Sequence, residues 1–374
     1  MRKKPQVDCF LLIVVSLLCI IGVLAIFSAG APFGYIDDNA PPYGWAMNQL
    51  KWLGLGVLFL FFASRLNYHF YKRFDRIVIL FVILSLLLVF VPKLGRQIRG
   101  VHRWITFGSF QIQPSELAKL GIIIYLSCSL VRKKDRIISF IGGFLPYLII
   151  ISLIFLLVMI EPDLGSALII AGVGFVLIYA GGAKISHMLY VAALGILPVY
   201  FSISKIGYRK NRIIAFLNPE SDPLGIGFQP LHLKMSIGAG GLWGMGPGKG
   251  NEKLFYLPTP HTDSIFAVIG EEFGFIGTSL IVLLFLIFTW RGLKIAKRAP
   301  DELGKLLAIG LTCLISGQAL INMGVATVIL PTTGSALPFI SYGGSSLLTS
   351  LVAIGILLNI SKQSKLNKRN GTRG

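Results

Sequence analysis

Long apolar stretches alternate with short polar connections along nearly the whole chain. Runs of about 18 or more residues with almost no charge are long enough to cross a lipid bilayer as helices. Ten such spans are predicted: Cys9–Phe27, Met47–Ala63, Ile77–Pro92, Pro114–Val131, Ile137–Ile160, Leu164–Ala183, Ile185–Ser204, Ser264–Trp290, Leu306–Leu330 and Phe339–Ser361. The pattern predicts an all-α polytopic membrane protein in which residues 1–374 form a single domain. Because ten is even, both termini lie on one side of the membrane.

Composition excludes two broad classes. Hydrophobic residues make up 54% of the 374 residues and charged residues 14%, whereas a soluble domain carries about 25% charged residues. A soluble globular enzyme and a disordered chain are therefore both excluded. The net charge of +19 is spread over short connections between apolar runs. It is typical of a membrane topology signal and does not indicate nucleic-acid binding.

Positive charge predicts the orientation of the chain. Most of the 35 Lys and Arg residues fall on the side of the N-terminus, so both termini, with the tail 362–374, are predicted to be cytoplasmic. Two outer segments run against this rule, since five cations lie between Lys93 and Lys119 and seven between Lys205 and Lys253. An anionic, phosphate-bearing partner would explain them. The alternative is that neighbouring helices fix the orientation and the outer charges are merely tolerated.

The predicted outer segment 205–262, between the seventh and eighth spans, is far longer than any other connection. Connections of this length are functional or disordered, and its aromatic residues argue against disorder. Leu231–Ile237 is predicted to be a short amphipathic helix. The glycine-rich run Gly238–Gly250 offers backbone N–H groups that can hold a phosphate. A flexible linker is the alternative interpretation.

Asp263 follows this segment and directly precedes the eighth predicted span. A carboxylate at a partly desolvated cavity mouth suits a general base. Asp is also a favoured helix N-cap, and the two roles can coexist. Glu271 and Glu272 lie within the same span, where charged groups are rare and face a protein interior or a wet cavity.

Further polar residues interrupt apolar surroundings. Glu116 and Lys119 are three positions apart, so they share a helix face and can form a structural ion pair. Glu161 and Asp163 place two carboxylates between two spans. The uncharged stretch Leu330–Ser346 is dense in Pro, Gly and hydroxyl groups, which predicts either a re-entrant turn beside a cavity or an ordinary loop. The histidines lack the spacing of a catalytic zinc site.

Taken together, these motifs resemble one family, the SEDS proteins (shape, elongation, division, sporulation) typified by RodA, FtsW and SpoVE. The resemblance is closest to the FtsW/SpoVE branch. The matching stretches follow one another in the order of the family: Gly100–Ile105, Gln113–Lys119, Glu161–Ser166, Tyr208–Gln229, Leu257–Gly277 and Leu330–Ser346. The chain departs from the usual family residues at Ala239, Glu252, Thr259 and Ser264.

The resemblance implies a peptidoglycan glycosyltransferase of the bacterial cytoplasmic (inner) membrane. It would polymerise lipid II, an undecaprenyl-pyrophosphate disaccharide-peptide, into glycan strands at the outer face, in cell division or shape maintenance. The essential aspartate of the family maps onto Asp263, and one base without a second nucleophile implies inversion at the anomeric carbon. The implied substrate-binding residues are Arg103, Lys119, Arg209, Arg212, Glu116, His261 and Ser341. The carboxylates expected to organise the cavity or to assist a metal are Glu161, Asp163, Glu271 and Glu272.

The resemblance also implies partners. These are lipid II itself, a class B penicillin-binding protein acting as transpeptidase, and other division or elongation proteins. No cofactor is certain, and a divalent cation, Mg or Mn, on the pyrophosphate is possible. Two alternatives remain, namely a lipid II flippase and a non-catalytic scaffold for a transpeptidase. Many transporters contain paired half-sequence repeats, and none is visible in this chain.

Overall fold

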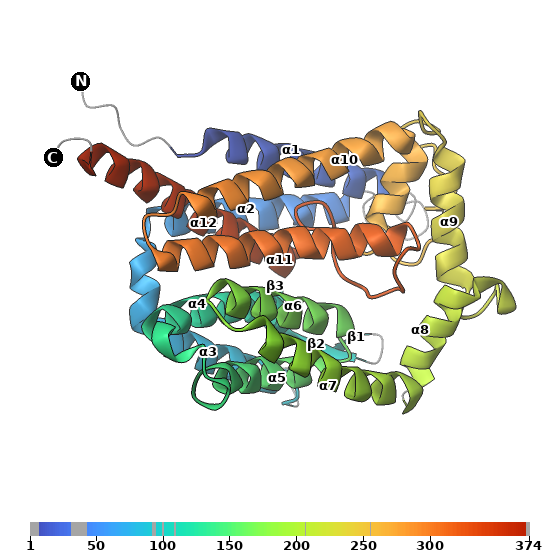
Figure 1. Ribbon diagram of the computed structural model, residues 1–374. Coiled ribbons are helices and arrows are strands. Elements are labelled where there is room, and N and C mark those ends of the chain that lie inside the picture. Colours follow the sequence, from blue (N-terminus) through green and yellow to red (C-terminus); the bar gives the residue numbers. More distant parts are fainter. Residues whose placement is uncertain are drawn as a thin grey trace, which may run out of the picture.

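The computed structural model describes residues 7–30, 43–91, 95–98, 101–107, 110–205, 207–254 and 256–371. It is mostly helical (Figure 1), and every predicted span falls on a helix. Seven helices of the described residues are long and apolar enough to cross a membrane. The helices that carry the predicted spans are α1 (Cys9–Gly30), α2 (Gly44–Arg65), α3 (Tyr71–Leu88), α4 (Pro114–Arg132), α5 (Leu145–Ile160), α6 (Leu164–Ala180), α7 (Ile185–Lys205), α10 (Ile265–Lys297), α11 (Glu302–Ala326) and α12 (Gly344–Gly371).

The helices form two groups, drawn one above the other in Figure 1. One group contains α1, α2, α10, α11 and α12, and the other contains α3 to α7. Helix α12 packs mainly on α2, and α10 on α11, while α4 and α6 connect the two groups through contacts with α11. The start of α1 and the end of α12 lie at the same end of the bundle. The opposite end, called the distal end below, carries α8, α9 and a small sheet.

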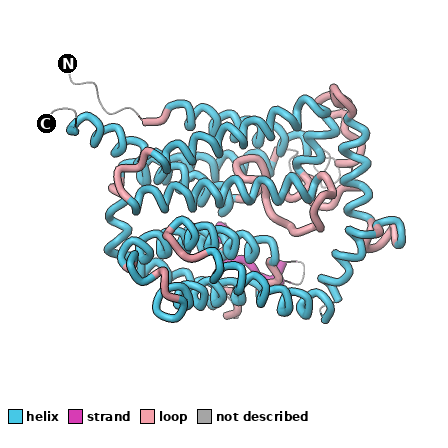
Figure 2. The backbone as a smooth tube through the Cα atoms, in the orientation of Figure 1, coloured by secondary structure: helices cyan, strands magenta, loops and turns pink. Residues whose placement is uncertain are grey.

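The all-α prediction is incomplete, because three short strands form an antiparallel sheet. They are β1 (Gly95–Ile98), β2 (Val101–Phe107) and β3 (Phe110–Ile112), in the order β1-β2-β3. Figure 2 shows these strands as the one magenta region of the described backbone. Ile105 pairs with Ile112 and Thr106 with Gln111, and β-branched residues of this kind favour strands. The strands are too short to be recognised among the membrane spans of the sequence. Strand β2 fixes the position of Arg103.

The predicted outer segment 205–262 is structured. It contains α8 (Gly207–Leu217), a 3₁₀ turn (Pro219–Ser221) and α9 (Phe228–Gly240). The predicted helix Leu231–Ile237 lies inside α9, which confirms it. Helix α8 was not predicted, since its three basic residues mask its apolar face. Shorter elements complete the chain: 3₁₀ turns at Tyr68–Phe70 and Lys134–Arg136, and a π-helical turn at Phe140–Phe144 that leads into α5.

Helix α10 is broken at Gly274, and the glycine-rich run forms hydrogen bonds with the backbone groups on both sides of the break. Gly274 adopts φ 62° and ψ −158°, a conformation almost restricted to glycine. The N–H groups of Met245 and Gly246 donate to the carbonyl oxygens of residues 271 and 272 at 2.9 and 3.0 Å. In return, Phe275 and Ile276 donate to the carbonyls of residues 241 and 242 at 2.9 and 3.3 Å. These N–H groups satisfy the broken helix, so the predicted phosphate cradle is wrong for this part of the run.

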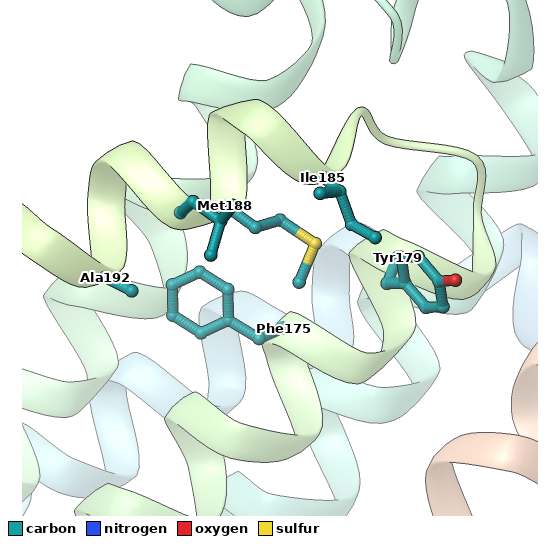
Figure 3. Close-up of a pocket in the computed structure, with 6 residues that line it drawn as sticks. Phe175, Tyr179, Ile185, Met188 and Ala192 are labelled. Carbon is teal, nitrogen blue, oxygen red and sulfur yellow. The ribbon is translucent and has the colours of Figure 1, made fainter.

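An apolar space separates α6 from α7. It has a volume of about 460 Å³ and is lined by Phe175, Tyr179, Ile185, Met188, Leu189 and Ala192. Figure 3 shows the side chains of Phe175 and Met188 projecting into this space from the two helices. None of the described residues that line it is charged, so an apolar chain is the kind of molecule that it can hold.

Candidate active site

Asp263 lies at the distal end, in the turn that precedes α10. The cap residue of α10 is Ser264, so the prediction that Asp263 caps the helix is wrong. The amide of Asn322, on α11, donates to the backbone carbonyl of Asp263 at 3.1 Å and to that of Ser335 at 2.7 Å. This one side chain therefore holds the Asp263 turn against the segment 331–338, and leaves the Asp263 carboxylate to face other groups.

Two arginines from separate elements face the Asp263 carboxyl. Burial raises the pKa of Asp263 above its usual range, the guanidinium groups of Arg212 and Arg103 act in the opposite direction, and Asp163 adds to the rise. Arg212, on α8, is held by a hydrogen bond from Nη1 to the Thr332 carbonyl at 2.7 Å. A carboxylate with a raised pKa is a stronger base than a free one. The arrangement therefore combines a base with two cations.

Arg103, on β2, is anchored by the corner between α5 and α6. Its Nε donates to the Glu161 carbonyl at 2.8 Å, and Nη2 donates to the Pro162 carbonyl. Asp163 caps α6 by accepting from the Ser166 N–H at 3.0 Å, and Gln113 donates to its second oxygen at 3.1 Å. The sheet, the corner and the start of α4 thus form one polar unit around Arg103.

Glu161 differs from its neighbours in this unit. Its side chain is fully buried, and among the described residues neither carboxyl oxygen has a hydrogen-bond partner. Burial, followed by the nearby Asp163, raises the pKa of Glu161 to about 8, although Arg103 opposes the shift. The Glu161 carboxyl therefore holds a proton at neutral pH.

His261 and Ser341, both predicted to bind substrate, brace the turn that carries Asp263. Ser341 Oγ donates to the Thr262 carbonyl at 2.7 Å and accepts from the Leu337 N–H at 2.7 Å. The His261 ring stacks on Trp45 with centroids 3.8 Å apart. Of Arg209, the structure describes the backbone, as part of α8; the predicted role of its side chain lies outside the described residues.

Glu116 and Lys119 form the ion pair that their spacing predicts. Lys119 Nζ lies 2.7 Å from Glu116 Oε1, and both side chains are buried. The same ammonium donates to Gln318 on α11 at 3.1 Å, and Thr349 on α12 donates to the second Glu116 oxygen at 3.5 Å. The pair therefore connects α4, α11 and α12.

Replacing Lys119 with methionine should lower the free energy of unfolding by about 3–5 kcal/mol, because the buried Glu116 carboxylate would lose its partner. Thermal unfolding of the purified protein measures the loss. The double change Lys119→Met with Glu116→Gln removes both charges and should recover much of the stability. A single variant as stable as the unmodified chain would show that the pair is not structural.

Glu271 and Glu272 do not join Asp263. Glu271 Oε1 accepts from the N–H groups of Asn251 and Glu252 at 2.5 and 3.0 Å. Glu272 Oε1 pairs with the buried Lys253 ammonium at 2.5 Å. Both carboxylates attach the end of the glycine-rich run to α10, about 12 Å along the helix from Asp263 at ~1.5 Å per residue.

Several residues of the site were missed by sequence reasoning. Asn322 carried a signal, since an amide within an apolar helix is expensive unless it is satisfied. Gly334 has φ 74°, and a Cβ there would lie 3.3 Å from Asp263 Oδ2. Lys253 is buried although it lies in a polar stretch, and nothing in its local sequence indicates this.

The site offers no clear metal-binding cluster. Within the described ranges, no group of three His, Cys, Asp or Glu side chains has the arrangement to hold a metal ion. The donors on Asp163 already occupy both of its oxygens. A divalent cation carried by a pyrophosphate stays a prediction.

Comparisons with known proteins find relatives over nearly the whole chain. The chain is 41% identical to stage V sporulation protein E of Bacillus subtilis, over 97% of this chain and 99% of that protein. It is 40% identical to a probable peptidoglycan glycosyltransferase FtsW of Geobacter metallireducens, over 98% and 97% of the two chains.

Two solved structures share the fold. One, described as structural coordination of polymerization and crosslinking by a peptidoglycan synthase complex, has a TM-score of 0.79 and 29% identity, over 96% of this chain and 98% of that one. The other is the rod shape determining protein RodA of Thermus thermophilus, with a TM-score of 0.70 and 26% identity, over 96% and 97%. The family model described as cell cycle protein matches residues 8–366. The chain therefore belongs to the FtsW/RodA/SpoVE family of cell cycle proteins.

Proposed function

We propose that this protein is a peptidoglycan glycosyltransferase that polymerises lipid II into glycan strands. The observation that carries the proposal is the Asp263 carboxyl, half-buried at the distal end and faced by Arg103 and Arg212. A base beside two cations suits the transfer of a sugar from a pyrophosphate leaving group. The name of the FtsW relative supports the same activity.

Asp263 and the two arginines have separate roles in the proposed reaction. Asp263 removes the proton from the acceptor sugar hydroxyl, whose oxygen then forms a bond with the anomeric carbon of the donor. The bond between that carbon and the pyrophosphate oxygen breaks, and the leaving group keeps the electron pair. Arg103 and Arg212 stabilise the charge that grows on it. Attack from the face opposite the leaving group inverts the anomeric carbon.

The proposed topology has ten spans, cytoplasmic termini and the segment 205–262 outside the bacterial cytoplasmic membrane. The start of α1 and the end of α12 lie at the same end of the bundle, which supports it. Labelling a cysteine placed at the exposed Ser221 with a membrane-impermeant reagent on intact cells tests the orientation.

The apolar space between α6 and α7 suits a polyprenyl tail. A lipid II analogue with a short tail should then need a higher concentration to reach the same rate of strand formation.

The proposed partner is a class B penicillin-binding protein, in cell division or shape maintenance. Support comes from the solved complex that coordinates polymerization with crosslinking. Co-purification of the two proteins from membranes tests it.

The activity is tested by incubating the purified protein with labelled lipid II. Strands resolved by length support the polymerase. A flippase would instead move lipid II between the leaflets of vesicles without lengthening it, and a scaffold would do neither.

Arg212→Gln should lower kcat/KM by about 10²–10³, because one of the two cations facing the leaving group is lost. The melting temperature should change by only a few degrees, since the Arg212 side chain is only partly buried. Lys210→Gln, on the exposed side of α8, is the matched control and should keep its activity. Equal loss of activity and stability in Arg212→Gln would mean that the arginine is structural.

A further inference from the structure

The buried carboxyl of Glu161 takes no part in the proposed reaction described above. It lies at the end of α5, next to the two carbonyls that hold Arg103. Among the described residues neither of its oxygens has a partner. A buried acid that stayed ionised without partners would be strongly unfavourable, so its environment favours the protonated form.

Arg103 is the cation nearest to this acid in the polar unit. In the described part of the chain its hydrogen bonds go to two neutral carbonyls, and no carboxylate lies within ion-pair distance of it. Arg103 also stabilises the ionised form of Glu161, and Arg103 and Arg212 that of Asp263. The same guanidinium therefore interacts with two acids whose protonation states differ.

The other charged groups facing this corner nearly balance. Asp163 caps α6 from the same corner, and Asp263 and Arg212 come from the start of α10 and from α8. With Glu161 neutral, Arg103 and Arg212 offset Asp163 and Asp263. Ionisation of Glu161 would add one uncompensated negative charge at the place where a pyrophosphate is expected.

We propose that Glu161 is a positioning residue that acts through Arg103. With its proton in place, the Glu161 carboxyl leaves the guanidinium directed at the pyrophosphate of the substrate. When the proton passes to solvent, the carboxylate attracts the guanidinium and repels the pyrophosphate. This inference rests on the proposed function, because it assigns a pyrophosphate to the site.

The sign of the pH dependence follows. Burial and Asp163 raise the pKa of Glu161 to about 8, so the acid is neutral below this pH and substrate affinity is fully present there. Affinity falls as the pH rises above it. If the protonated form binds alone, the loss approaches about tenfold per pH unit.

The experiment measures KM and kcat for lipid II between about pH 6.5 and 9.5. In the unmodified protein, KM should rise above about pH 8 while kcat changes little. In Glu161→Gln, which keeps the shape of the neutral acid but cannot ionise, KM should stay constant over the same range. Glu220→Gln makes the same chemical change at an exposed position of the outer segment and should keep the rise. Arg103→Gln should show a higher KM, and its rise should begin at a higher pH than in the unmodified protein, because Arg103 no longer lowers the pKa of Glu161.

The proposal is overturned if the KM of Glu161→Gln rises as in the unmodified protein, if the unmodified protein shows no rise, or if the KM of Arg103→Gln rises at the same pH as that of the unmodified protein. A second measurement does not depend on turnover: stabilisation of the protein against heat by undecaprenyl pyrophosphate should weaken above the same pH, and should not weaken in Glu161→Gln. If no strands form at any pH, the proposed function fails, and this binding curve still tests Glu161.

Discussion

Replacement of Asp263 with asparagine should reduce strand formation from lipid II by about 10²–10⁴, the contribution typical of a general base. The amide has nearly the same shape but cannot accept the proton of the acceptor hydroxyl. Asn322 binds the backbone carbonyl of Asp263 and not its carboxylate, so the turn should keep its conformation. Quantifying strands from purified protein, together with the melting temperature, separates loss of chemistry from loss of fold.

The pH dependence gives an independent check on Asp263. Because burial raises the pKa of its carboxyl, the base becomes protonated at a pH above the usual range for aspartate. The rate should therefore fall on the acid side, below this raised pKa, through kcat. Asp222→Asn, at an exposed position of the outer segment, is the control and should keep both rate and pH profile. Normal strand formation by Asp263→Asn would remove Asp263 from the chemistry.

Gly274→Ala should lower the free energy of unfolding by at least about 3 kcal/mol, because alanine disfavours the conformation of Gly274 and its Cβ would clash with neighbouring backbone. A Cβ at Gly274 would lie 2.4 Å from the Gly244 nitrogen and 2.7 Å from the Leu242 carbonyl carbon. Both are backbone atoms of the run that repairs α10, so neither can move without breaking its hydrogen bonds. Thermal unfolding in detergent or lipid nanodiscs measures the effect.

Gly172→Ala is the matched control for Gly274→Ala. It lies inside α6, and a Cβ there would meet nothing within 4 Å. Alanine favours a helix over glycine by up to about 1 kcal/mol, so this variant should be as stable as the unmodified chain or more stable. A small effect of Gly274→Ala would mean that α10 can close its break and that the glycine-rich run is not needed to satisfy it.

The membrane helices were predictable because their signal is local. An apolar run such as Cys9–Phe27 needs no partner to be recognised. The strands around Arg103 are short and α8 carries three basic residues, so no local pattern distinguishes them from loops. The same limit explains why the broken helix was missed: Gly274 acquires its meaning only when the residues 241–246 lie against it.

The candidate site divides in the same way. Asp263, Arg103 and Arg212 were predicted from charge against the topological rule and from the family resemblance, and the fold brings them together. Glu271 and Glu272 carry the same kind of signal, an acid within an apolar helix, yet they bind the backbone and the ammonium of the segment 251–253. A buried acid can be recognised from sequence, whereas a partner outside its own helix cannot.

The repaired break in α10 makes the outer segment and the catalytic turn mechanically continuous. Four backbone hydrogen bonds join the glycine-rich run to the helix, and the first residues of that helix follow Asp263 directly. A displacement of the glycine-rich run would therefore tilt the short helical piece between Ser264 and Gly274 about the break in α10. A protein that binds the outer segment could in this way shift the base relative to its two arginines without touching either of them.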